Sequence, residues 1–207
     1  MREVNDHSGI SRRNFIKGLG GGIAGAGAIS AGGCTTAQVG PHGAQVVGME
    51  PVSISIKVNG KVHHLQVDPR TTLLDALRND LDHTGSKRVC NRGQCGACTV
   101  IMNGKTVLAC SMLALDADGA LIETIEGLAK GDKLHPVQEA FVKHDALQCG
   151  FCTPGFIMSC VSLLRENDQP TLEEIKNGVS GNLCRCGTYP NIFAAVADAA
   201  ETMRKGG

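Results

Sequence analysis

The sequence predicts an α+β protein of two small domains, a β-grasp domain over residues 51–128 and an all-α domain of four helices over residues 134–207. Two observations predict this division. In the first range, apolar and polar residues alternate along short stretches joined by Asn-Gly pairs, which is typical of half-buried strands and hairpin turns. In the second range, apolar residues recur at helical spacing, and a linker over residues 129–133 separates the two patterns.

Hairpins dominate the expected β-grasp domain. Asn59-Gly60 follows the first alternating stretch and predicts a tight turn into a return strand. Pro69 and Arg70 break that strand, and Thr71 or Thr72 can then cap a short helix. The expected elements are a hairpin over 52–58 and 61–68, a helix over 73–81, a loop over 82–98, a second hairpin over 99–102 and 105–110, and a last strand over 121–125.

The expected helices of the second domain are marked by their first residues. Pro154 suits the first turn of a helix that runs to about Glu166. Thr171 and Glu174 form a capping box that opens the next helix, and helices are also expected over 136–144 and 191–204. Because a domain of about 75 residues buries little core, we expect a group held by cysteines to stabilise this half.

Residues 1–50 predict a signal peptide and a linker. Arg12 and Arg13 precede the stretch 18–33, which holds eight Gly, four Ala and only three large aliphatic residues. Such a stretch is too short and too weakly apolar to span a bilayer, so we do not expect an integral membrane protein. The Arg pair favours the twin-arginine (Tat) translocon and a periplasmic location over the Sec route. A flexible tail with a chance Arg pair is the alternative.

The cleavage point of this signal is not fixed by one motif. Small residues favour cleavage within residues 37–46. Cys34 follows Ala31-Gly32-Gly33, which resembles a lipoprotein box without its usual large aliphatic residue, so lipidation of Cys34 is a minor alternative.

Charge and motif content exclude several functions. Lys+Arg and Asp+Glu number 20 each, and a zero net charge argues against a nucleic-acid binder. The chain has no constellation of catalytic acid, base and nucleophile, no dinucleotide-binding glycine fingerprint and no P-loop, so no substrate site is expected in it.

The first four-cysteine set has the spacing of a known cluster site. Cys90, Cys95 and Cys98 follow the C-x4-C-x2-C pattern, and eleven residues separate Cys98 from Cys110. This is the ligand pattern of plant-type [2Fe–2S] ferredoxins. Three thiolates must converge from one loop, and Gly93, Gly96 and Ala97 would let that loop wind tightly and aim backbone N–H groups at sulfur.

The second set consists of two close pairs. Cys149-x2-Cys152 and Cys184-x-Cys186 are separated by 31 residues, and each pair precedes an expected helix. A helix N-terminus stabilises a thiolate, so these four residues predict a second [2Fe–2S] cluster. Cys160 is expected to be a buried core thiol.

Two alternatives remain for the cysteines. Export would permit disulfides, but the pairs are too tightly spaced for ordinary long-loop bridges. Zinc could be held by the second set, although the four-residue step of the first set does not resemble a zinc site. The seven histidines do not have the spacing of Rieske ligands and are expected to be surface or satisfied residues.

Four motifs from residue 52 onward carry a resemblance to a known family: CNRGQCGACTV (90–100), HPVQEAF (135–141), QCGFCTPG (148–155) and SGNLCRCGTYPNI (180–192). On these motifs the chain resembles the iron–sulfur small subunit of the xanthine dehydrogenase/aldehyde oxidoreductase family of molybdenum hydroxylases. Together with the Arg pair, it is most similar to the subunit of periplasmic aldehyde oxidoreductases. Val89 departs from the family, which usually has Gly before the first cysteine.

The resemblance implies a heterotrimer with a large subunit that carries the molybdenum cofactor and another that carries FAD. It implies that the cluster of the second set lies beside the molybdopterin, near Gln148 and Cys186, and that the cluster of the first set lies toward the flavin. The chain would then be an electron-transfer subunit of an enzyme that oxidises aldehydes to carboxylic acids. A purine or N-heterocycle hydroxylase would need the same wiring. A free-standing ferredoxin-like carrier is a further alternative, which the zero net charge disfavours.

Overall fold

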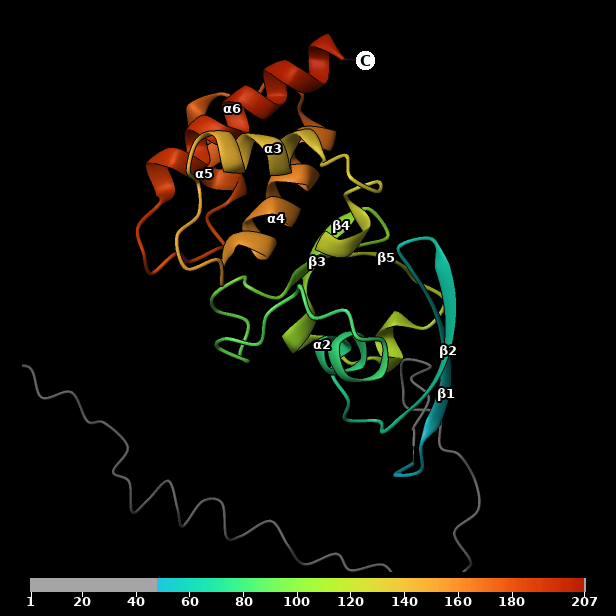
Figure 1. Ribbon diagram of the computed structural model, residues 1–207. Helices are drawn as coiled ribbons and strands as arrows, with labels where there is room; N and C mark the ends of the chain where they lie inside the picture. The colour runs from blue at the N-terminus through green and yellow to red at the C-terminus, as the bar shows by residue number, and fades with distance from the viewer. Residues whose placement is uncertain (1–47, 207) are drawn as a thin grey trace, which may run out of the picture. The chain divides into compact units, whose positions relative to one another are not determined.

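The computed structural model describes residues 48–206 and confirms an α+β fold, with strands in the first half and helices in the second (Figure 1). No helix within these residues is long and apolar enough to cross a membrane. The signal segment, the Arg12-Arg13 pair and Cys34 lie outside the described residues. The elements are β1 (Val52–Val58), β2 (Lys61–Val67), α2 (Leu73–Asp75), β3 (Thr99–Met102), β4 (Lys105–Leu108), β5 (Leu121–Glu123), α3 (Pro136–Lys143), α4 (Thr153–Glu166), α5 (Leu172–Gly178) and α6 (Tyr189–Lys205).

The strands form one five-stranded mixed sheet in the order β2-β1-β5-β3-β4. β1 is antiparallel to β2 and parallel to β5, whereas β3 is antiparallel to both β4 and β5. The alternation seen in the sequence is real, since Ile54, Ile56 and Val58 of β1 are buried. Asn59 and Gly60 take positive φ angles of 49° and 86°, as the expected hairpin turn requires.

Three elements of the sheet half differ from expectation, and one of them is β5, which ends at Glu123 instead of residue 125 because Ile125–Gly127 form a 3-10 turn. The helix after Thr72 is α-helical only over Leu73–Asp75 and continues as a π-helical turn over Ala76–Asp80. The second hairpin ends at Leu108, two residues early, because the chain turns into a 3-10 helix over Ala109–Ser111. That turn buries Cys110 at the end of the hairpin.

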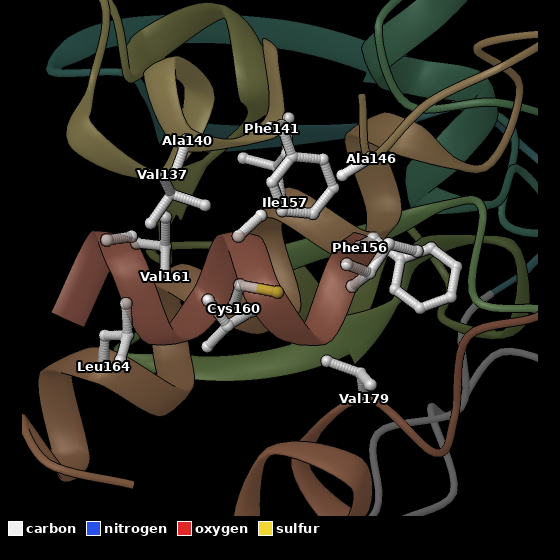
Figure 2. Close-up of a cluster of buried hydrophobic side chains, with 14 of the residues drawn as sticks. Val137, Ala140, Phe141, Ala146, Phe156, Ile157, Cys160, Val161, Leu164 and Val179 are labelled. Carbon is white, nitrogen blue, oxygen red and sulfur yellow. The ribbon is translucent and has the colours of Figure 1, made fainter. Parts of the chain in front are cut away.

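α4 is the centre of the helical half (Figure 2). Its residues from Gly155 to Ser162 are buried without a break, so the helix is covered on all sides. Around it lies a core of 20 buried residues, which includes Ile101 of β3, against 16 in the core of the sheet half. The expectation that this half has little core is therefore wrong, because α4 packs on the sheet as well as on the other helices.

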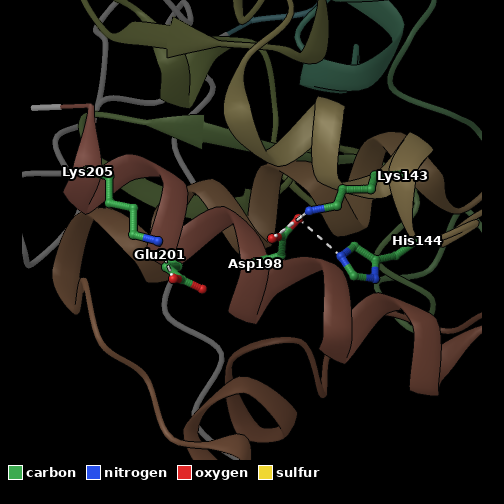
Figure 3. A network of polar contacts seen from close by, with 5 residues as sticks. All are labelled: Lys143, His144, Asp198, Glu201 and Lys205. Carbon is green, nitrogen blue, oxygen red and sulfur yellow. Dashed lines mark hydrogen bonds and ion pairs between the residues drawn. The ribbon is translucent and has the colours of Figure 1, made fainter.

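The helix starts follow the expected signals. Thr171 and Glu174 form the capping box of α5, and Pro154 lies in the first turn of α4. Cys160 is fully buried in the middle of α4, as expected. α6 runs beside α3, and its Asp198 meets Lys143 at 2.8 Å and His144 at 3.1 Å (Figure 3). His144 is thus a satisfied histidine.

Candidate metal centres

The first cysteine set comes together between the loop after the π-helical turn and the 3-10 turn after β4. The thiol of Cys90 interacts with that of Cys95, and the thiol of Cys98 interacts with those of Cys110 and Cys95. The fold therefore gathers the four sulfurs that the C-x4-C-x2-C spacing selects.

Backbone N–H groups of this loop point at sulfur. The Gly93 N–H donates to Cys110 Sγ and the Gln94 N–H donates to Cys90 Sγ, each at 3.4 Å. Gly93 has a φ of +70°, and a Cβ atom there would lie 2.8 Å from Ser111 Oγ. The tight winding that was expected of the glycines is present, and it supplies the N–H···S contacts that tune a cluster.

The environment gives the thiols of this set different pKa values. The Arg92 backbone N–H is the main cause that lowers the pKa of Cys90 to about 6. Burial, together with the neighbouring Cys110 thiol, raises the pKa of Cys98 to about 12. Iron binds thiolates, so cluster assembly would release a proton from the buried member.

The second set joins the N-terminal ends of two long helices. Cys149 interacts with Cys186, and Cys152 interacts with Cys184. Cys152 is the N-cap residue of α4, and the Cys184 pair stands just before Thr188, the N-cap residue of α6. The expected placement at helix starts is therefore observed.

A lowered pKa was expected for the thiols at both helix starts, but of Cys152 and Cys184 only Cys184 has a lowered pKa. Although burial opposes it, the Thr188 hydroxyl and backbone N–H lower the pKa of Cys184 to about 7, and Thr188 Oγ1 lies 3.2 Å from Cys184 Sγ. Burial and the Cys184 thiol instead raise the pKa of Cys152 to about 12. At Cys152, desolvation outweighs the helix terminus.

The two sets differ in how they meet the surface. Cys98 and Cys110 are buried within the sheet core, and Cys184 is buried within the helical core. Cys149 and Cys186 are both exposed, and so is Gln148 beside them. The second set thus has one open edge. Phe151 and Leu183, two apolar residues next in sequence to this set, are 59% and 55% exposed.

The donor sets fit [2Fe–2S] clusters better than the alternatives. All nine described cysteines are free thiols, so none of the eight candidate ligands is in a disulfide. Four thiols with N–H and hydroxyl donors at sulfur match what an iron–sulfur cluster requires. The assignment of all eight as ligands stays a prediction.

A direct contact joins the two sets. The Leu183 N–H, next to Cys184, donates to the Cys95 carbonyl at 3.0 Å. The neighbouring Asn182 is buried and hydrogen-bonds to Gly96. Sequence reasoning assigned no role to Asn182, because its partner lies 86 positions away and no local pattern shows such a contact.

Comparison with known proteins identifies both halves. Residues 56–124 match the family model of the 2Fe-2S iron-sulfur cluster binding domain, and residues 124–197 match that of the [2Fe-2S] binding domain. These descriptions decide against zinc as the group that the second set is built for.

Relatives match along most of the chain. The aldehyde oxidoreductase iron-sulfur-binding subunit PaoA of Escherichia coli K12 is 44% identical over 217 aligned positions, which cover 94% of this chain and 90% of PaoA. The nicotine 6-hydroxylase small subunit of Paenarthrobacter nicotinovorans is 52% identical over 148 positions, which cover 72% of this chain and 89% of that subunit.

Solved structures share the fold. Quinoline 2-oxidoreductase from Pseudomonas putida 86 superposes with a TM-score of 0.73 at 44% identity, covering 76% of this chain and 98% of the matched chain. Aldehyde oxidoreductase from Desulfovibrio gigas gives a TM-score of 0.72 at 44% identity, covering 75% of this chain and 18% of the longer one. The chain therefore belongs to the family of two-domain iron–sulfur subunits of aldehyde oxidoreductases and related molybdenum hydroxylases, and it is a subunit of an oxidoreductase complex.

Proposed function

We propose that this chain is the electron-transfer subunit of an exported, heterotrimeric molybdenum hydroxylase that oxidises aldehydes to carboxylic acids. The observation that carries the proposal is the pair of four-thiol sets, which the Leu183–Cys95 hydrogen bond joins directly. One set has an open edge at Cys149 and Cys186, whereas the other has Cys98 and Cys110 buried in the sheet core and Cys90 and Cys95 partly exposed.

The proposed reaction fixes what this chain must carry. Oxidation of R–CHO with water gives R–COOH, two protons and two electrons. A [2Fe–2S] cluster takes up and gives back one electron at a time, so two clusters in series pass the pair in single steps to FAD. Substrate chemistry would take place in the large subunit, which holds the molybdenum cofactor.

The protein groups around each thiol set do the remaining work. Cys90, Cys95, Cys98 and Cys110 would hold one cluster, and Cys149, Cys152, Cys184 and Cys186 would hold the other. The Gly93 and Gln94 N–H groups and the Thr188 hydroxyl stabilise negative charge on sulfur, which favours the reduced cluster. The protein thereby adjusts the potential of each step.

The open edge of the second set suggests where the molybdenum subunit docks. Cys149, Cys186 and Gln148 are exposed there, and an exposed cluster edge allows a short transfer distance to a cofactor in a partner. Exposed Phe151 and Leu183 add apolar area for such an interface. We assign Gln148 and Cys186 to contact with the pterin, and the first cluster to the side of the FAD subunit.

Export by the twin-arginine route to the periplasm is supported by the Arg12-Arg13 pair and the weakly apolar stretch behind it. Tat substrates cross the membrane folded, so clusters could be inserted beforehand. Replacing both arginines with lysine should leave a folded, cluster-loaded protein in the cytoplasm. Export of that variant by the Sec route would contradict the proposal.

A second candidate function is that of the electron-transfer subunit of an N-heterocycle hydroxylase. The 52% identity to the nicotine 6-hydroxylase small subunit and the superposition on quinoline 2-oxidoreductase favour it. Because we expect no substrate site in this chain, the two candidates differ only in the partner.

The deciding experiment is isolation of the complex from its native host through a tag on this chain. We expect a large subunit with a molybdenum cofactor and a subunit with FAD, and faster electron-acceptor reduction with aldehydes than with nicotinate, quinoline or purines. The reverse preference would favour the second candidate. Recovery of this chain alone, with clusters, would favour a free carrier.

A further inference from the structure

The buried side chain of Asn182 lies where the two thiol sets meet. It is 4% exposed. We propose that Asn182 is a positioning residue that fixes the separation and orientation of the two clusters and thereby sets the rate of electron transfer between them. This inference rests on the proposed function, because it requires a cluster in each set.

Hydrogen bonds of Asn182 reach both halves of the molecule. Its Nδ2 donates to the Gly96 carbonyl at 3.0 Å and approaches Thr99 Oγ1 at 3.5 Å. Its Oδ1 accepts from the Ser159 hydroxyl of α4 at 2.7 Å. The carbonyl can only accept and the hydroxyl can donate, so these partners fix which way the amide points.

Asn182 and the next residue, Leu183, both hydrogen-bond to the loop that carries the first cysteine set. The Asn182 side chain donates to the Gly96 carbonyl, and the Leu183 N–H donates to the Cys95 carbonyl at 3.0 Å. The residue after Leu183 is Cys184, a candidate ligand of the second cluster. A shift of Asn182 would therefore move candidate ligands of both clusters relative to one another.

The glycines around this junction show how closely the two halves approach. A Cβ atom on Gly96 would lie 2.5 Å from both Asn182 Nδ2 and the Gly181 carbonyl oxygen. A Cβ atom on Gly155, in the first turn of α4, would collide with the Gly96 carbonyl oxygen. The Gly96 carbonyl thus lies between the first turn of α4 and the side chain of Asn182.

A second link between the halves serves as a matched comparison. Arg165 of α4 forms a bidentate ion pair with Glu123 of β5, in which the two guanidinium nitrogens lie 2.7 and 2.8 Å from the two carboxylate oxygens. Both side chains are over 40% exposed. This link contains no residue of either cysteine loop. Breaking this ion pair therefore tests the effect of weakening the contact between the halves without touching either cysteine loop, which can be compared with the effect of changing Asn182.

The test uses the full-length chain loaded with iron and sulfide, in three versions: wild type, Asn182→Leu and Glu123→Gln. Leucine keeps the branching of the Asn182 side chain at Cγ and removes its donors and acceptor. Iron and sulfide content and the optical spectrum report whether both clusters are present. Electron paramagnetic resonance (EPR) of the fully reduced chain reports the magnetic interaction between the clusters, and pulse radiolysis reports the transfer rate.

We expect Asn182→Leu to retain both clusters, with a changed magnetic splitting and slower transfer between the clusters. We expect Glu123→Gln to match wild type in both readouts. Equal splitting and rate in Asn182→Leu would overturn the inference, and so would equal changes in both variants.

If Asn182→Leu fails to load clusters, Ser159→Ala provides the second test. It keeps the amide donors of Asn182 and removes the hydroxyl that orients them, so a smaller change in the same splitting is expected. An unchanged splitting would overturn the inference. Absence of two clusters from the wild-type chain would instead refute the proposed function, so the two failures are distinguishable.

Discussion

The two thiol sets are built into their domains in different ways. The first set has two members, Cys98 and Cys110, inside the core of the sheet half, whereas the second has only Cys184 inside a core and leaves Cys149 and Cys186 exposed. A cluster held by the first set would therefore be part of the packing of its domain, while a cluster held by the second set would be attached along one edge to helices that already pack well. We therefore expect the dependence of each half on its cluster to follow ligand burial rather than domain size.

Serine replacement of a buried and an exposed ligand gives the largest expected contrast. Cys98→Ser should lose the first cluster and place a hydroxyl in an apolar core, which costs about 1–3 kcal/mol in addition to the lost cluster binding. Cys149→Ser should lose the second cluster but leave both halves folded. Iron content should fall to about two per chain in each variant. The unfolding temperature should fall much further for Cys98→Ser than for Cys149→Ser.

Cys160→Ser is the control for these replacements. Cys160 is as buried as Cys98 but lies in α4, away from either set. It should keep all its iron and lose only stability. Equal unfolding temperatures for Cys98→Ser and Cys149→Ser would contradict the burial argument.

Glycines in the two cysteine loops give the next contrast. Gly96→Ala in the first loop combines a φ of +68° with collisions against Asn182 and Gly181, whereas Gly150→Ala in the second loop has a φ of +81° and open space. We expect Gly150→Ala to cost about 1 kcal/mol from backbone strain alone. Gly96→Ala should cost more and should also disturb the EPR signal of the first cluster. Equal losses of unfolding free energy in the two variants, measured by denaturant unfolding, would contradict this comparison.

The Glu123–Arg165 pair gives a smaller effect with a defined pH dependence. Hydrogen bonds from Arg165 hold the pKa of Glu123 below its ordinary value of 4.5. A depressed folded-state pKa stabilises the protein above the unfolded-state pKa, and the stabilisation is lost as the pH falls through the folded value. Because the pair is exposed, Glu123→Gln should cost about 1 kcal/mol or less at pH 7.

Melting curves of wild type and Glu123→Gln from pH 7 to pH 3 would check this. The difference between them should shrink as the pH falls. A difference that grows in acid would show that the carboxylate contributes with the opposite sign.

The smallest effect is expected on the helical surface far from the sheet. Asp198 of α6 accepts from Lys143, the last residue of α3, and contacts His144, the residue that follows α3; Lys143 is 66% exposed (Figure 3). Asp198→Asn should lower stability by only about 0.2–1 kcal/mol, and less at high salt. Melting in low and high salt would measure it, and a loss comparable to that of Cys98→Ser would show that the helical core is weaker than its burial indicates.

Local signals were enough to predict most of the fold. Asn-Gly turns, the capping box at Thr171 and Pro154 all mark what the structure contains, because each acts through neighbours within a few residues. The size of the helical core could not be predicted. Its buried residues come mainly from α3, α4, α5 and α6, together with Ile101 of β3, and no sequence window contains all of these elements.

The grouping of the cysteines was also predictable from the sequence, while their role as cluster ligands stays a prediction. Ligand spacing selects the same eight residues that the fold gathers, since a cluster demands convergence of thiolates. The raised pKa of Cys152 was missed, because its cause is burial by distant parts of the chain. The bridge through Asn182 was missed for the same reason, since its contacts join residues 86 positions apart.

The central claim, two unlike clusters in one chain, is tested most directly by metal analysis joined to stepwise reduction of the full-length protein. We predict about four irons and about four acid-labile sulfides per chain, and two distinct EPR signals that develop at different potentials. Cys98→Ser should remove one signal, and Cys149→Ser should remove the other. About two irons with a single signal in fully loaded protein, or zinc in place of iron, would contradict the account.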